Sequence, residues 1–107
     1  MRWNPFSTEQ IDGFARTLAD ELARRYPAEV EAGEKDEARS VKTERRLRRT
    51  LESVYGKARE YRERERLGVY RRARLGNTFK WDLLERGYAE AFVEEVTHGL
   101  VVTLSRR

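Results

Sequence analysis

The chain has 107 residues, of which 38% are hydrophobic and 39% are charged, and it contains no cysteine. This length predicts a single domain over residues 1–107, and the lack of cysteine excludes disulfide frameworks, thiolate catalysis and thiolate metal sites. The sequence has neither the apolar centre of a signal peptide nor an apolar run near the ~18 residues of a membrane span, so we expect a cytoplasmic protein with no membrane partner.

Charge is distributed unevenly along the chain. Between Arg39 and Arg74 there are fourteen Lys or Arg residues and five acidic residues, which gives this stretch a net charge of +9 within a total of only +4. Residues 1–38 have a net charge of −4. Since a partner responds to the local field rather than to the total, this pattern predicts a polyanion such as nucleic acid as the first partner. A second candidate partner for the basic stretch is the acidic segment 29–37, of the same or of a second copy of the chain.

The first predicted element is an amphipathic helix over residues 7–26. Its apolar stripe recurs at three- and four-residue steps and consists of Ile11, Phe14, Ala15, Leu18, Leu22 and Ala23. Ser7 is placed to be its N-cap with Gln10 as the reciprocal capping-box partner, and Phe6 is placed to form a hydrophobic staple. We therefore expect a capped N-terminal helix.

A long basic helix is predicted next, after a break. Pro27 ends the first helix, because the residue before a proline is disfavoured in the helical region, and residues 27–36 predict an acidic linker. The long helix covers residues 37–67, and its apolar stripe is Leu47, Leu51, Val54, Tyr55, Ala58 and Tyr61. At ~1.5 Å per residue it is longer than the first helix, so we expect one end to project or to contact another subunit. Gly56 predicts a close crossing by another helix.

Residues 69–77 predict a connector whose structure the pattern leaves open, because one set of apolar residues alternates as in a strand and another has helical spacing. Gly76 and the following Asn77 predict a break before a short helix over residues 78–86, which Gly87 ends. A second short helix is predicted over residues 90–97, ending at His98 and Gly99.

The apolar tail, residues 100–104, is predicted to be either a short strand or a final helical turn. A strand would have to pair with residues 69–75 or with its twin in a dimer, because unpaired backbone groups are costly to bury. The expected fold class is therefore mostly α, a small bundle built on the capped N-terminal helix and the long basic helix, followed by two short helices and the apolar tail. A small α+β variant stays open.

The cations of the long helix provide the first candidate site. Six of them fall on one flank about 80° wide at 3.6 residues per turn, and these are Arg39, Lys42, Arg46, Arg49, Lys57 and Arg64. Guanidinium groups are always charged and donate paired hydrogen bonds to phosphate oxygens. The alternative is a solvated helix held by i,i+4 ion pairs, for which the sequence offers Glu44–Arg48, Arg48–Glu52, Arg59–Glu63 and Glu60–Arg64.

The connector and the C-terminal part supply further candidates. Tyr70 is placed to stack on bases beside three cations, which are Arg71, Arg72 and Arg74. Trp81 lies roughly opposite the apolar side of its helix and is a candidate partner-facing residue. The tail contributes three candidate partner contacts, Leu100, Val102 and Leu104.

Catalytic and base-reading motifs are missing from the sequence. His98 is the one histidine, no phosphate-binding glycine loop is present, and we expect no enzyme, no cofactor, no metal and no small-molecule substrate. A helix-turn-helix over residues 78–97 is disfavoured, because its second helix would carry Glu90, Glu94 and Glu95 toward phosphates. Two hypotheses remain: a nucleic-acid-binding accessory protein that contacts phosphates, or a protein-interaction or homo-oligomerisation module.

Overall fold

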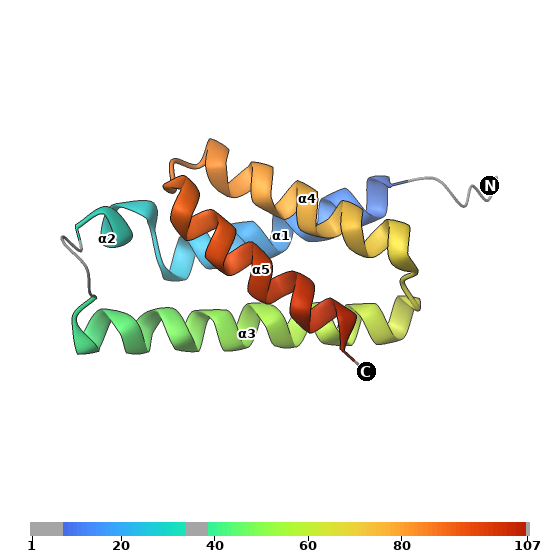
Figure 1. The fold of residues 1–107 in the computed structure, drawn as a ribbon, viewed down its shortest axis with the longest axis horizontal. Coiled ribbons are helices and arrows are strands. Elements are labelled where there is room, and N and C mark those ends of the chain that lie inside the picture. The colour runs from blue at the N-terminus through green and yellow to red at the C-terminus, as the bar shows by residue number, and fades with distance from the viewer. Residues whose placement is uncertain (1–7, 34–38, 107) are drawn as a thin grey trace.

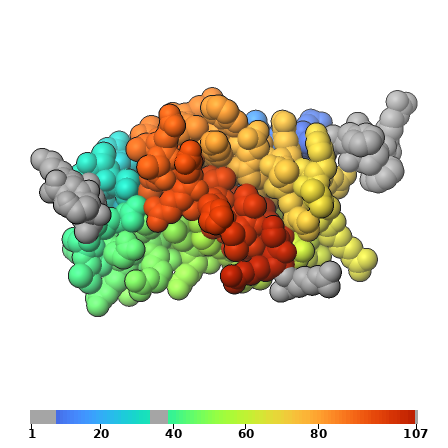
Figure 2. Space-filling view, viewed as in Figure 1, coloured from blue at the N-terminus to red at the C-terminus, as the bar shows by residue number. Residues whose placement is uncertain are grey.

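The computed structural model describes residues 8–33 and 39–106, and this part of the chain forms five helices and no strand (Figure 1). In chain order they are α1 (Glu9–Arg25), α2 (Ala28–Ala32), α3 (Val41–Glu65), α4 (Val69–Glu85) and α5 (Glu90–Ser105). The predicted mostly α bundle is confirmed. The helices α1 and α5 each pack against both α3 and α4, and in Figures 1 and 2 α3 runs along one edge of the molecule with α5 crossing in front of it.

One cluster of buried apolar side chains joins four of these helices. The predicted stripe of α1 and that of α3 both face it, and among its fully covered members are Leu18, Leu22, Val54, Leu75, Phe79, Leu83, Val93 and Leu100. Two aromatic residues close one end of the cluster: Tyr26 and Tyr88 are buried, and the hydroxyl of Tyr88 donates a hydrogen bond to the carbonyl of Tyr26 at 2.5 Å.

The boundaries of the first three helices differ in detail from the prediction. Ser7 and Phe6, which were to form the cap and the staple, lie outside the described residues, and Thr8 directly precedes α1 without a capping hydrogen bond from its side chain. The helix ends at Arg25, before Pro27, as predicted. The linker prediction was wrong in part, because Ala28–Ala32 form the short helix α2, with Pro27 as its N-cap.

The helix α3 begins at Val41 rather than at residue 37. Ser40 is its N-cap, with its hydroxyl accepting a hydrogen bond from the backbone N–H of Thr43 at 3.1 Å. The end of α1 and the helix α2 lie over the N-terminal end of α3 (Figure 1), where Arg46 donates a hydrogen bond to the Arg25 carbonyl. The predicted projection is therefore wrong for this end of the long helix.

Residues 69–77 are not a connector but the first half of α4. Gly76 was predicted to break the chain, yet it lies inside the helix, where a Cβ would lie 3.0 Å from a methyl carbon of Val101. Glycine at this position lets α4 and α5 pack closely. The predicted end at Gly87 is correct: its φ is +100°, its N–H donates to the Leu84 carbonyl, and the N–H of Tyr88 donates to the Leu83 carbonyl. These are the two bonds of a Schellman motif.

The break predicted at His98 and Gly99 is also wrong, because α5 continues through both to Ser105. The tail is helical, and both Leu100 and Leu104 are buried in the core, since they continue the apolar side begun by the earlier residues of α5. Gly99 packs against the ring of Tyr55, whereas a Cβ at Gly56 would meet no other atom within 4 Å. The close helix crossing predicted at Gly56 thus occurs elsewhere.

Candidate polyanion-binding groove

Several cations predicted to bind phosphate instead hold the fold together. Arg39 donates to both carboxylate oxygens of Glu31, at 2.8 and 3.1 Å, and longer bonds of 3.4 and 3.5 Å reach Glu44 and Glu95. Its guanidinium carbon lies 5.7 Å from the centre of the Phe92 ring. Since its side chain is only 18% exposed, Arg39 ties α2, α3 and α5 together and has little surface left for a ligand.

Lys57 is similarly engaged. Its ammonium lies 2.5 Å from the carboxylate of Glu21, which is buried and also accepts hydrogen bonds from Ser53 at 2.6 Å and Arg25 at 3.1 Å. Burial raises the pKa of Glu21, but these three hydrogen bonds outweigh it and hold the pKa below its usual value. The cluster links α1 to α3.

The cations that begin α4 also make structural contacts. Arg74 donates two hydrogen bonds, of 2.9 and 3.0 Å, to the carboxylate of Asp12, which is 8% exposed and accepts a third from Thr78. The bonds from Arg74 hold the pKa of Asp12 below its usual value. Arg72 reaches the Leu67 carbonyl at 3.4 Å, and Arg71 is partly buried.

Arg64 lies toward the C-terminal end of α3, with Glu65 at 3.4 Å and the Tyr61 ring at 5.6 Å. Tyr70 is exposed, as base stacking would require, but it follows the end of α3 that is remote from Lys42 and Arg46 (Figure 1). The structure therefore separates the predicted basic flank into two regions rather than forming one continuous site.

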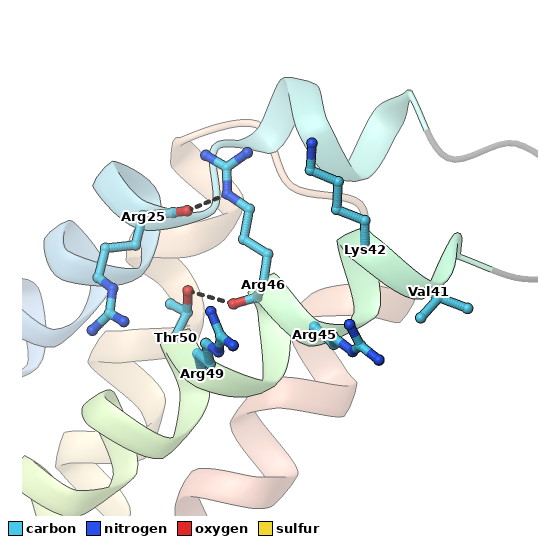
Figure 3. A pocket seen from close by; sticks show the side chains of 7 residues that line it. All are labelled: Arg25, Val41, Lys42, Arg45, Arg46, Arg49 and Thr50. Carbon is cyan, nitrogen blue, oxygen red and sulfur yellow. Dashed lines mark hydrogen bonds between the residues drawn. The ribbon is translucent and has the colours of Figure 1, made fainter.

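The remaining three predicted cations lie together in a groove between the end of α1 and the first half of α3. This groove of about 640 Å³ is lined by Arg25, Val41, Lys42, Arg45, Arg46, Arg49 and Thr50. Five of these residues are basic and no acidic residue lines it (Figure 3). We call it the basic groove. Within the described part of the chain, Lys42, Arg45 and Arg49 make no ion pair or side-chain hydrogen bond.

Two contacts orient the floor of the basic groove. The Nε of Arg46 donates to the Arg25 carbonyl at 2.7 Å, which positions the guanidinium, while its two terminal nitrogens make no hydrogen bond within residues 8–33 and 39–106. Thr50 is buried and donates to the Arg46 carbonyl at 2.9 Å. In Figure 3 Lys42 and Arg46 extend on the same side of α3, toward α2. The basic side chains of the groove therefore come from α1 and α3, and the hydrogen bond from Arg46 to the Arg25 carbonyl links these two helices at the groove.

Sequence reasoning missed two of the five cations of this groove. Arg45 falls outside the 80° flank, although its spacing from Lys42 and Arg49, at i+3 and i−4, places all three on neighbouring turns. Arg25 belongs to another helix, and its position follows only from how α1 packs on α3. The four i,i+4 ion pairs of the alternative interpretation are not formed between the described side chains, so carboxylates on α3 do not neutralise this end of the helix.

Only one of the four predicted partner contacts is an exposed side chain. Trp81 is 57% exposed, whereas Leu100 and Leu104 are core residues and Val102 is half-buried. The tail was assigned to a partner because it had no obvious contact within the chain. Because Leu100 and Leu104 pack inside the bundle, the tail does have contacts within the chain, and the reason for assigning it to a partner no longer holds.

Comparisons with models of protein families, with curated proteins and with solved structures find no match to this chain. Among the helices of residues 8–33 and 39–106, none combines the length and apolarity needed to cross a bilayer. The same residues contain no group of three or more His, Asp or Glu side chains arranged to hold a metal ion.

Proposed function

We propose that this protein is a non-enzymatic, cytoplasmic nucleic-acid-binding protein that contacts phosphates through the basic groove. One observation carries the proposal: five basic side chains from α1 and α3 line a single groove without a carboxylate among them. Elsewhere on α3, Lys57 lies beside Glu21 and Arg64 beside Glu65. In the basic groove, Lys42, Arg45 and Arg49 make no ion pair among the described residues and lie close together, so their charge is available to a ligand.

The chemistry of the groove suits the phosphate backbone. Arginine remains charged at all physiological pH values and donates two parallel hydrogen bonds to phosphate oxygens. The terminal nitrogens of Arg46 are held in place by its bond to the Arg25 carbonyl, so less side-chain entropy is lost on binding. Contacts of this kind position a protein on nucleic acid but carry no base information. We therefore expect little sequence preference and a strong dependence on salt.

Two triple variants with equal changes of charge test the groove directly. The first changes Lys42, Arg45 and Arg49 to Gln, and the control changes Arg16, Arg59 and Arg106, which are exposed and make no ion pair among the described residues. Binding of labelled duplex DNA, single-stranded DNA and RNA is measured by fluorescence anisotropy at about 50 mM salt.

The first triple should weaken binding by about ten-fold or more, and the control by less than about three-fold. Equal losses would mean that diffuse charge, not the groove, attracts the ligand. An unaltered chain that binds none of the three probes would reject the proposed function. Circular dichroism of each variant confirms that the helices are retained.

A further inference from the structure

A second groove lies between α4 and α5, apart from the basic groove. It has a volume of about 190 Å³ and is lined by Lys80, Trp81, Leu84, Glu90, Val93 and Glu94. Trp81 is 57% exposed in a chain whose other large aromatic rings on α4 and α5 are buried, apart from Tyr70. This volume is below the ~300–1,000 Å³ of sites for small molecules. It suits one apolar side chain from a partner.

The edge of this second groove is acidic. Glu90 and Glu94 form no ion pair among the described residues, and α5 contains no Lys or Arg between Glu90 and Ser105. The ammonium of Lys80 lies over the Trp81 ring at 6.0 Å. An occupant that matches this surface carries an apolar side chain with basic residues beside it, because opposite charges favour docking and fix its orientation.

The chain itself presents such a segment at the start of α3. Val41 is 70% exposed. Lys42 follows it directly and Arg45 lies one turn further on, and neither has an acidic partner in the described part of the chain. In Figure 1 the start of α3 and the connection from α4 to α5 lie toward the same end of the molecule. A two-fold axis near this end would let each copy offer both surfaces to the other.

We propose that two copies of this chain form a two-fold dimer in which Val41 of each copy enters the α4–α5 groove of the other, beside Trp81. Lys42 and Arg45 then face Glu90 and Glu94 across the interface. A contact of this type uses each surface twice and closes on itself, so assembly stops at two copies. The dimer does not depend on nucleic acid: Trp81, Glu90 and Glu94 lie outside the basic groove, whereas Val41, Lys42 and Arg45 line it, so the dimer and a nucleic acid compete for these three residues.

Sedimentation equilibrium of the full chain, without nucleic acid and at about 50 mM salt, tests the dimer. The mass should rise from 12.7 kDa to twice that value with protein concentration. Trp81→Ala, the pair Glu90→Lys and Glu94→Lys, and the pair Lys42→Glu and Arg45→Glu should each raise the dissociation constant by about ten-fold or more. The control pair Glu52→Lys and Glu63→Lys, on the exposed side of α3, should leave it unchanged.

An equimolar mixture of the two charge-reversed double variants gives the sharpest result. Each pair alone places like charges at both contacts of the dimer, whereas the mixed dimer places opposite charges at both. The mixture should therefore regain the dimer that each variant has lost. A chain that stays monomeric at several hundred micromolar, a mixture that shows no regain, or an assembly larger than a dimer would each overturn the proposal. Loss of nucleic-acid binding alone would not.

Discussion

Replacement of Gly99 by alanine tests the packing of α5 on α3, which holds the tail inside the bundle. The hydroxyl of Tyr55 donates a hydrogen bond to the Val96 carbonyl at 2.6 Å, and the ring lies against Gly99. A Cβ added to Gly99 would lie 2.8 Å from the Cζ of Tyr55 and still nearer its oxygen. The ring must therefore move, and the hydrogen bond is lost or strained.

The net change in the free energy of unfolding combines two destabilising contributions and one stabilising contribution. The lost hydrogen bond costs about 1 kcal/mol, crowding of the packed ring costs about 1–3 kcal/mol, and the better helix propensity of alanine offsets about 1 kcal/mol. We expect Gly99→Ala to lower the free energy of unfolding by about 1–3 kcal/mol. For a domain of this size each kcal/mol lowers the melting temperature by about 4–8 °C.

Urea and thermal unfolding, followed by circular dichroism, measure this change. Gly13→Ala and Gly56→Ala are matched controls, because both glycines lie inside helices and a Cβ at either would meet no other atom within 4 Å. Both controls should raise stability, by up to about 1 kcal/mol. In a Tyr55→Ala background the crowding is absent, so Gly99→Ala should no longer destabilise. If Gly99→Ala alone is as stable as the two controls, the described packing is wrong.

Three further predictions follow from the polar contacts and one turn. Arg74→Ala leaves the carboxylate of Asp12 without its main partner, so the urea midpoint of unfolding should fall, while nucleic-acid affinity changes by less than about three-fold. The pKa values of Asp12 and Glu21 are lowered in the fold, so stability should be retained above about pH 5 and fall as these groups are protonated; Asp12→Asn should reduce this slope in urea midpoints measured against pH. Gly87→Ala places a side chain at φ +100° and should cost about 1–3 kcal/mol in thermal unfolding.

The parts of the fold that follow from local chemistry were predictable. Pro27 ends a helix and Gly87 closes one because each acts through its own backbone geometry. Gly76 and Gly99 look the same in sequence but do not end helices, since their role is to accommodate Val101 and Tyr55. These contacts join residues far apart along the chain. No local pattern distinguishes such a glycine from one that ends a helix.

The apolar tail shows how packing overrides local preference. Its β-branched residues favour a strand, but Leu100 and Leu104 lie one turn apart and are both buried. The candidate site shows a related limit. The sequence predicts a basic region, yet Glu31, Asp12 and Glu21, which engage its cations, belong to α1 and α2. Which cations stay available depends on tertiary contacts.

The salt dependence of binding tests the central proposal most directly. Because each phosphate contact releases counterions, the logarithm of the association constant for duplex DNA falls by about 0.9 per contact for each tenfold rise in salt. Arg25 is paired with Glu21, which leaves four cations of the basic groove without an ion pair among the described residues, so the slope measured between about 50 and 300 mM salt should lie between about −3 and −3.6. The variant with Lys42, Arg45 and Arg49 changed to Gln should lower its magnitude by about 2–3. A slope that this variant leaves unchanged would contradict phosphate binding by the groove.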